Sequence, residues 1–402
     1  MSTRYEFTLP RSFQPAEFLG GRLLTRADDA RWLVSQIVRK IASRDTDPWG
    51  CARLHSDVLG RVMHKNTVSA VVEALEAGGA IETAPYYAGV KAKGYRLAKR
   101  YLGDRSVQVP ATDPRLIARI EAERERRHAD EQRTRWLPVH YALDREQQAV
   151  TITQDADAIL DGLPDHSRLC QHVLVSRIQR RELPFSVSST GRVFNSITGL
   201  KRELRQALRL DGEHLGSVDL VCAQPALLSM LLLAKTHPNG PKHRETYKHY
   251  PGPCLPACPE TGPDFSAFAS LACGGSLYDR LMADTGLDRT SVKLGLLRDV
   301  LAKRGKYPSV VETTFRREFP SVYRVIRAVN RQDHGELIRL LQHTESWLVI
   351  GLVAPRLLGR VRITTLHDAI FSQRQSIARV ADCFRDVFRE LGVSMALKCE
   401  EN

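Results

Sequence analysis

The most constraining stretch of this chain is residues 217–231, SVDLVCAQPALLSML, in which one carboxylate stands inside an apolar run. Apolar residues flank Asp219 on both sides, and Gln224-Pro225 leads into a second apolar run, so we expect a buried strand that turns into a helix. A buried charge is costly unless it is paired or bound to a metal. The stretch therefore predicts that a partner for Asp219 lies elsewhere in the chain.

The length and charge of the chain narrow its class. Its 402 residues allow two or three domains, and a formal net charge of +13 favours a polyanionic partner such as nucleic acid. The opening residues MSTRYEFTLPRSF lack the apolar core of a signal peptide, and the longest apolar stretch, around 226–234, is too short to cross a membrane. We therefore expect a cytoplasmic protein without membrane association.

The first hundred residues predict three helices followed by a two-stranded hairpin. The helices are expected at 28–43, at 56–63 with Ser56 as its N-cap, and at 67–77 with Asn66 as its N-cap and Gly78-Gly79 as its end. The segments AIETA and GYRLA read as the two strands of the hairpin. This order resembles a winged-helix domain, which we place at residues 1–103.

The resemblance to a winged helix implies DNA binding, in which the third helix enters the major groove. That helix carries two Glu and neither Lys nor Arg, so the lysines of the hairpin tip, Lys91 and Lys93, are the better candidates for phosphate contact. Winged helices also serve as docking modules for proteins. A protein partner for this module therefore stays open as an alternative.

The remaining chain divides into a charged segment and a larger domain. Residues 104–140 contain a run of alternating charges, which is typical of an exposed helix or a linker. Residues 141–402 mix strand-like runs with amphipathic helices, which indicates an α+β fold.

A second carboxylate on an apolar background occurs far downstream, in RITTLHDAIFS, where His367-Asp368 interrupts an alternating pattern. Two Asp residues on separate strands can share divalent metal ions, as two-metal nucleotidyl transfer requires, and Mg²⁺ or Mn²⁺ is the expected ion. The alternative is that Asp219 and Asp368 belong to two unrelated buried ion pairs.

The two most basic stretches of the chain flank these carboxylates in sequence. Residues 171–210 contain eight Lys or Arg against two Asp or Glu, and residues 289–331 contain eleven against three. An acidic centre within basic surroundings is suited to holding phosphates and attracting a polyanion. This pattern favours the metal-sharing interpretation.

The order of four motifs resembles the family A polymerases, which include DNA polymerase I and the phage-type single-subunit RNA polymerases. The motifs are Thr190-Gly191-Arg192 before the first strand, the strand and turn VDLVCAQPALLSML, the helix segment RTSVK with Arg289 and Lys293, and LHDAI with His367-Asp368. The likeness covers about residues 185–375. It implies an antiparallel palm sheet with packed helices and reduced fingers.

The resemblance also implies roles for individual residues. Asp219 and Asp368 would be the metal ligands, and His367 would lie near the primer end. The resemblance places Arg192 and Gln342 at the primer–template. Arg289 and Lys293, four residues apart on one helix face, would bind the triphosphate.

Departures from the family pattern fall at the sugar pocket. Gln224 stands where the DNA polymerases of the family have Glu, and Leu301 stands where the family has an aromatic residue. Both residues would shape the nucleotide site. The resemblance therefore does not imply whether this chain uses dNTP or NTP.

These observations predict a small template-dependent polymerase or primase-polymerase that takes DNA and nucleoside triphosphates, used in replication, priming or repair, for example of a mobile element or phage. The alternative from another class is a DNA-binding replication initiator or regulator whose palm is degenerate and does not catalyse synthesis.

Overall fold

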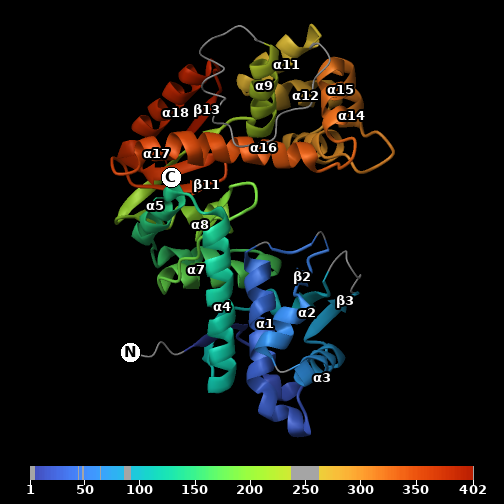
Figure 1. The fold of residues 1–402 in the computed structure, drawn as a ribbon, viewed down its shortest axis with the longest axis vertical. Helices are drawn as coiled ribbons and strands as arrows, with labels where there is room; N and C mark the ends of the chain where they lie inside the picture. Colours follow the sequence, from blue (N-terminus) through green and yellow to red (C-terminus); the bar gives the residue numbers. More distant parts are fainter. Residues whose placement is uncertain are drawn as a thin grey trace. The chain divides into compact units, whose positions relative to one another are not determined.

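The computed structural model describes residues 5–43, 45–47, 49–63, 65–85, 92–236 and 262–401. They form two compact units, each made of discontinuous stretches of chain. Unit 1 comprises residues 1–134, 150–184 and 196–209, and unit 2 comprises 135–149, 185–195 and 210–402. Both units contain helices as well as strands, and every strand pairing given below is antiparallel, so the chain is of the mixed α+β class (Figure 1).

Unit 1 begins with strand β1, which pairs with β5, and then carries three helices and a three-stranded sheet of order β2-β4-β3. The elements are β1 (Glu6–Pro10), α1 (Ala27–Ala42), β2 (Ala52–Arg53), α2 (Ser56–Val62), α3 (Lys65–Ala77), β3 (Ile81–Ala84), β4 (Gly94–Leu97) and β5 (Ser106–Pro110). The three helices and the following two-stranded hairpin that the sequence predicts are therefore confirmed.

The helix starts differ from the expected ones. His55, not Ser56, caps α2, because its imidazole accepts a hydrogen bond of 3.3 Å from the Asp57 amide. Helix α3 starts at Lys65, so Asn66 lies inside its first turn and is not the cap. The end of α3 is as expected, since Gly79 has a φ of +66°, which glycine adopts without strain.

The charged run folds as α4 (Pro114–Arg135), and this helix is partly buried where the sequence predicts an exposed helix or a linker. Leu116, Ile120 and Glu123 are buried. Glu123 accepts hydrogen bonds from Arg61 of α2 and from two arginines of its own helix, which lowers the pKa of its carboxyl to about 2. The alternating charges thus include a buried acid that ties α4 to α2.

The other elements of unit 1 come from later in the chain. They are β6 (Val150–Ile152), α6 (Asp155–Asp161), α7 (Asp165–Gln179), α8 (Arg202–Arg205) and β9 (Leu208–Leu210). Helix α1 packs against α7, and the Leu169 amide of α7 donates to the Leu102 carbonyl at 3.1 Å. Residues 150–184, which the sequence analysis assigns to the C-terminal domain, are therefore folded together with the N-terminal helices.

Unit 2 is built on an antiparallel sheet in the order β11-β12-β10-β13. The strands are β10 (Glu213–Leu220), β11 (Ile363–Leu366), β12 (Ala369–Gln373) and β13 (Leu397–Glu401), and the amphipathic α18 (Ile377–Leu391) packs on β10, β12 and β13. Gly216 permits this packing, because a Cβ there would lie 2.6 Å from Ile377 and 2.8 Å from the Glu400 carbonyl oxygen.

The helices of unit 2 form a continuous apolar core with the sheet. They are α5 (Pro138–Glu146), α9 (Ala223–Thr236), α11 (Asp264–Cys273), α12 (Leu277–Thr285), α13 (Arg289–Gly295), α14 (Val310–Glu318), α15 (Pro320–Val329), α16 (Glu336–Ser346) and α17 (Ala354–Leu357). π-Helical segments continue α13 to Leu301 and α16 to Val353. The short hairpin of β7 (Ser186–Val187) and β8 (Val193–Phe194) completes the unit.

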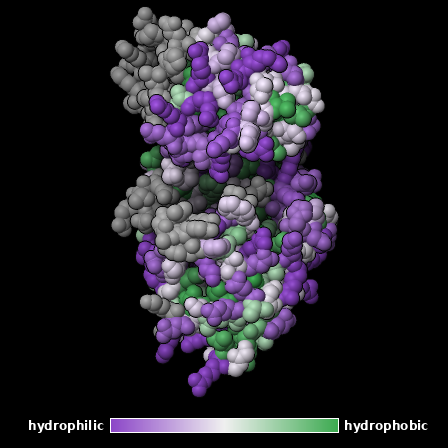
Figure 2. All heavy atoms as spheres, turned by 90° about the vertical axis from the view of Figure 1, so that its right-hand side faces the viewer, coloured by the Kyte–Doolittle hydropathy of each residue, from purple (hydrophilic) through white to green (hydrophobic). Residues whose placement is uncertain are grey.

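Hydrophilic and hydrophobic side chains are both present on the face seen in Figure 2. Figure 2 shows one face on which hydrophilic side chains predominate and hydrophobic ones form small groups. Among the residues that the structure describes, no helix combines the length and the apolar character that a bilayer crossing needs.

Candidate functional site

Asp219 and Asp368 are brought together by the pairing of β10 with β12. Asp219 lies opposite Ala369 in that register, so Asp368, one residue earlier, is placed beside it. The two carboxyl groups lie close enough for each to affect the pKa of the other. The expectation that Asp368 lies within a strand is wrong: it belongs to the turn between β11 and β12, where His367 has a φ of +55°.

The environment of the two carboxyls resists their ionisation. Burial is the largest influence and raises the pKa of Asp219 to about 7, with the negative charge of Asp368 adding to the rise. Burial also raises the pKa of Asp368. The Oδ1 atom of Asp219 has no hydrogen-bond partner within the described residues. Two adjacent half-buried acids with an unsatisfied oxygen favour the binding of a proton or a cation.

Lys293 supplies positive charge to this pair. It lies on α13, whose N-cap Asp288 accepts hydrogen bonds of 2.9 and 3.1 Å from the amides of the first turn. Its ammonium group lowers the pKa of both Asp219 and Asp368 but makes no ion pair within 4 Å among the described side chains. Lys293 is therefore near the carboxyls and still able to accept another anion.

Arg289 lies one turn earlier on α13, and its side chain is engaged. It forms an ion pair of 2.6 Å with Asp279 and lies over the ring of Tyr278, 5.4 Å from the centroid. Burial raises the pKa of Tyr278 to about 12, and the charge of Asp368 contributes to the rise. Tyr278 therefore lies against Arg289 and within the electrostatic influence of Asp368, and no sequence pattern pointed to it.

Arg192 is held by a carboxylate from a distant helix. Its guanidinium donates to both oxygens of Glu345 on α16, at 2.8 and 2.6 Å, and the side chains are 17% and 3% exposed. The charge of Arg192 lowers the pKa of Asp368, so the ion pair lies close to the acidic pair. Burial nevertheless raises the pKa of Glu345 to about 7. The sequence analysis gave Glu345 no role.

The turn that carries Arg192 is fitted to α16. Gly191 has a φ of +78°, and a Cβ at this position would lie 3.2 Å from that of Ser346. Thr190 donates a long hydrogen bond of 3.4 Å to Gln342. The structure therefore brings Arg192 and Gln342, which the sequence analysis named together, to one location.

The hairpin bearing His367-Asp368 is anchored by β8 and the residue after it. The Asn195 amide donates to the Thr365 carbonyl at 2.7 Å and to the Thr364 hydroxyl at 3.3 Å. The ring of Phe194 meets that of His367 edge-on, with centroids 5.6 Å apart. These contacts fix the turn on which Asp368 lies, and no sequence motif pointed to Asn195.

The remaining candidates are placed as follows. Gln224 is half-buried at the start of α9, immediately after the strand that carries Asp219. Leu301 is only 3% exposed and belongs to the hydrophobic core, and its carbonyl accepts a hydrogen bond of 2.7 Å from Asn330. Lys93 of unit 1 lies near Tyr95, with its ammonium 5.8 Å from the ring centroid. Lys91 lies outside the described residues.

Lys398 is a further cation that sequence reasoning missed. It lies opposite Asp219 in the pairing of β10 with β13, so the two side chains emerge on the same face of the sheet. Lys398 forms an ion pair of 2.5 Å with Glu400. Its sequence context, near the end of the chain and far from Asp219, carried no signal of this register.

The residues present fit a divalent metal with few protein ligands. Across the described part of the chain, no group of three or more His, Cys, Asp or Glu side chains is arranged to hold a metal. Mg²⁺ is often held by one or two carboxylates, with water and substrate phosphates completing its shell. Asp219 and Asp368, with the unpartnered Oδ1, are the residues that meet this requirement.

Comparison with known proteins gives little beyond this geometry. No family model matches the chain, and no curated protein matches it. Among solved structures, the chain is similar to the POL domain of Pol1 from M. smegmatis in complex with DNA primer-template and dNTP, with a TM-score of 0.29 and 12% identity. The likeness covers 68% of this chain and 64% of that domain. A likeness this weak carries no argument, and the chain spans less than two thirds of that domain.

Proposed function

We propose that this protein is a template-dependent nucleic-acid polymerase, a nucleotidyltransferase that extends a primer 3′-hydroxyl with a nucleoside triphosphate. The observation that carries the proposal is the pair of adjacent, half-buried carboxyls of Asp219 and Asp368, with the positive charge of Lys293 acting on both. Paired acids near a cation are suited to phosphoryl chemistry, in which charge neutralisation is the main task of the protein.

Asp219 and Asp368 would hold Mg²⁺ or Mn²⁺, which supplies charge neutralisation at the attacking hydroxyl and at the triphosphate. The carboxyls bind a cation as carboxylates, so they must lose the proton that burial stabilises. Both side chains are half-buried, so part of each remains exposed for a cation. The hairpin anchored by Asn195 keeps Asp368 in register with Asp219.

Lys293 would bind the triphosphate of the incoming nucleotide and neutralise charge as pyrophosphate leaves. Arg289, on the same face of α13, would join it by exchanging its exposed ion pair with Asp279 for a phosphate. Exposed ion pairs are worth only about 0–1 kcal/mol, so this exchange costs little. Gln224, at the start of α9, would contact the sugar, whereas we assign Leu301 to the core that supports α13.

Arg192 and Gln342 would seat the primer end, with His367 next to it. The pair with Glu345 fixes the direction of the Arg192 guanidinium, because both nitrogens that bind Glu345 are committed. Arginine has five donors, so those that remain can meet a nucleic-acid acceptor. Arg192 therefore acts from a fixed position, and a flexible side chain is not required.

Unit 1 would recruit the nucleic acid or a protein partner. Its α1, α2 and α3, followed by the hairpin of β3 and β4, have the element order of a winged helix, and the sheet order is β2-β4-β3. We propose that Lys93 at the described edge of the hairpin tip contacts phosphate. The high positive charge of the chain supports a nucleic-acid partner.

Primer extension with Mg²⁺ or Mn²⁺ tests the function directly. Asp219→Asn and Asp368→Asn should each abolish extension, since removing one member of a catalytic unit is about as damaging as removing all. Asp165→Asn is the matched control, because Asp165 is exposed, lies outside both sites and forms an ion pair with Arg168 of its own helix. Omitting template or primer separates templated from untemplated synthesis and from priming.

A different outcome would favour the other candidate. If the parent protein binds DNA tightly but incorporates no nucleotide with any template, it is a non-catalytic initiator or regulator. Extension that survives in both Asp variants would contradict the proposed site itself.

A further inference from the structure

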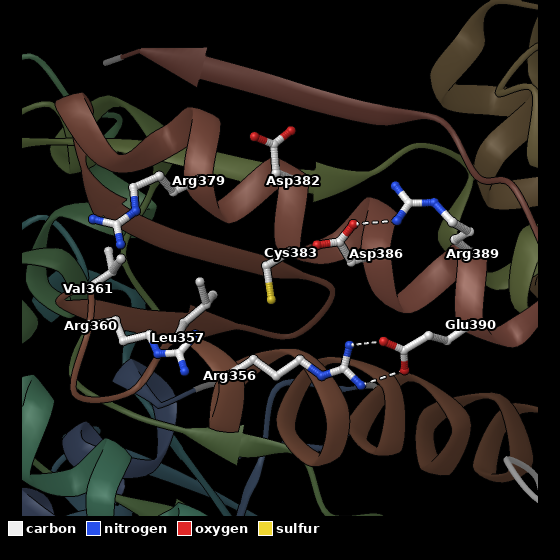
Figure 3. A pocket seen from close by; sticks show the side chains of 10 residues that line it. All are labelled: Arg356, Leu357, Arg360, Val361, Arg379, Asp382, Cys383, Asp386, Arg389 and Glu390. Carbon is white, nitrogen blue, oxygen red and sulfur yellow. Dashed lines mark hydrogen bonds and ion pairs between the residues drawn. The ribbon is translucent and has the colours of Figure 1, made fainter.

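A polar pocket lies between α17 and α18 of unit 2 and shares no residue with the site of Asp219 and Asp368. Its volume is about 590 Å³, within the usual range of small-molecule sites. Figure 3 shows its lining side chains on the two helices and on the turn after α17, with the Cys383 thiol directed between the helices and the Asp382 carboxyl directed away from α17. Ten residues line it: Arg356, Leu357, Arg360, Val361, Arg379, Asp382, Cys383, Asp386, Arg389 and Glu390.

All three acids of the pocket are already neutralised. Glu390 accepts two hydrogen bonds from Arg356, at 2.8 and 2.6 Å, and Asp386 forms an ion pair of 2.9 Å with Arg389. Asp382 pairs with an arginine of its own helix outside the pocket, at 2.7 Å. The carboxylates therefore add no net negative charge that would repel an anion.

Arg360 and Arg379 remain without a side-chain partner among the described residues. Neither guanidinium forms an ion pair within 4 Å or a side-chain hydrogen bond there, and both side chains are exposed. Figure 3 shows them at the end of the pocket away from the two ion pairs. The pocket thus carries two uncompensated positive charges at one end, in the residue type that binds phosphate with two donors.

The floor of the pocket is apolar. Leu357 and Val361 are buried, and Cys383, half-buried in the middle, directs its thiol toward the Val353 carbonyl at 3.7 Å. A ligand that suits this pocket has an anionic group for the arginine end and an organic part for the floor. A bare anion would leave the floor uncovered.

We infer that this pocket binds a phosphate-bearing small molecule of nucleotide size, with its phosphate on Arg360 and Arg379 and its organic part over Leu357, Val361 and Cys383. The site is separate from the proposed polymerase centre. Its occupancy is therefore measurable whether or not the chain synthesises nucleic acid.

Cys383 provides a local readout. The full-length protein is alkylated, and mass spectrometry of the Cys383 peptide measures how fast this thiol reacts. A ligand bound over the pocket floor blocks the reagent and slows the reaction. The pH is 8.5, because burial raises the pKa of this thiol and slows its reaction at neutral pH. The exposed Cys399 serves as internal control. The probes are ATP, ribose 5-phosphate, inorganic pyrophosphate and adenosine, all added with EDTA.

ATP or ribose 5-phosphate should slow alkylation of Cys383 about tenfold at saturation, as tight cover of a thiol requires, and leave Cys399 unchanged. Adenosine should not protect, and pyrophosphate should protect less than ATP. The comparison of ATP with ribose 5-phosphate tells whether a base is part of the ligand. Equal protection by adenosine, or none by any phosphate, overturns the inference.

Variants complete the test. Arg360→Ala together with Arg379→Ala should abolish protection without unfolding, because both side chains are exposed and unpartnered in the described structure. Arg280→Ala, an exposed arginine on α12 that pairs with Asp284 and Glu318 and does not line the pocket, should keep it. Asp219→Asn should also keep it, so failure of the polymerase proposal leaves this result intact. Unchanged protection in the double variant contradicts the assignment of the phosphate site.

Discussion

Glu345 and Arg192 form a buried ion pair with two hydrogen bonds, 2.8 and 2.6 Å long, between residues far apart in sequence. The pair lies beside Asp368, whose pKa Arg192 lowers. Its position joins the β7–β8 turn to α16. The ion pair therefore holds two elements of unit 2 together and also affects the charge of Asp368.

Removing one partner of this pair should destabilise the protein strongly. Arg192→Ala leaves the Glu345 carboxyl buried without its donor, and we expect a loss of about 3–5 kcal/mol in the free energy of unfolding at pH 8. Arg356→Ala is the control, because its partner Glu390 is exposed and such pairs contribute about 0–1 kcal/mol. Urea unfolding of both variants measures this; similar small losses would show that the Arg192 pair is not structural.

The acidic pair should also make stability depend on pH. The pKa of Asp219 is raised from 3.8 to about 7, so the folded protein keeps a proton there that the unfolded chain has released. The stabilisation that this bound proton gives to the folded state is present at pH 4 and is lost as the pH rises toward 7. Other carboxyls, such as Glu123 with a lowered pKa, act in the opposite direction, so the parent must be compared with Asp219→Asn.

We therefore expect Asp219→Asn to gain stability over the parent between pH 4.5 and pH 7.5, by on the order of 2 kcal/mol across that range. Denaturant unfolding in EDTA at several pH values measures the difference. A difference that stays flat with pH would mean that Asp219 is ionised in the folded protein throughout. Glu345→Gln provides an independent check, since the pKa of Glu345 is also raised to about 7.

Mg²⁺ should raise the melting temperature of the parent, and more at pH 8 than at pH 6. A ligand that binds the folded state only stabilises it, by about 2.7 kcal/mol at a hundredfold excess over its Kd. Protons compete for the same carboxyls, which accounts for the pH dependence. Asp219→Asn and Asp368→Asn should lose the shift, measured by calorimetry against NaCl of equal ionic strength. A shift that persists in both variants would place the cation elsewhere.

Lys293→Ala should raise the apparent KM for nucleotide about tenfold or more while leaving DNA affinity nearly unchanged, because a phosphate contact to the triphosphate is removed. Arg298→Ala is the matched control, since Arg298 lies on the continuation of the same helix but pairs with Asp299. Steady-state incorporation and DNA binding are measured separately. Loss of DNA binding in Lys293→Ala would show that Lys293 contacts the nucleic-acid backbone instead.

Local periodicity was sufficient to predict two of the amphipathic helices, those at residues 27–42 and 377–391. The apolar spacing in SIARVADCFRDVFREL predicts the helix found at Ile377–Leu391, and the pattern in residues 28–43 predicts α1. The buried-strand interpretation of Asp219 is also confirmed, since β10 contains it. In each case the spacing of the apolar residues along the sequence identifies the face that packs on the core.

The turn at Asp368 could not be predicted in this way. His367 adopts a positive φ without glycine or asparagine, so no residue type announces a turn there. The alternating pattern runs through it as through a single strand. The partners Glu345 and Asn195 were missed for a related reason, because each acts through a contact with a residue well over a hundred positions away in the chain.

Removal of residues 1–103 tests whether the rest of unit 1 can fold without the N-terminal helices. The sequence places a domain boundary there, whereas α7 packs against α1, and the Leu169 amide is bonded to the Leu102 carbonyl. Removing residues 1–103 would expose the buried face of α7, which includes Leu169, Val173 and Ile178. We expect the truncated chain to lose most amide protection in residues 165–179 on hydrogen exchange. The intact protein carrying Lys93→Ala should keep it, since Lys93 is at the hairpin. Full protection of α7 in the truncated chain would instead show that residues 104–402 fold without α1.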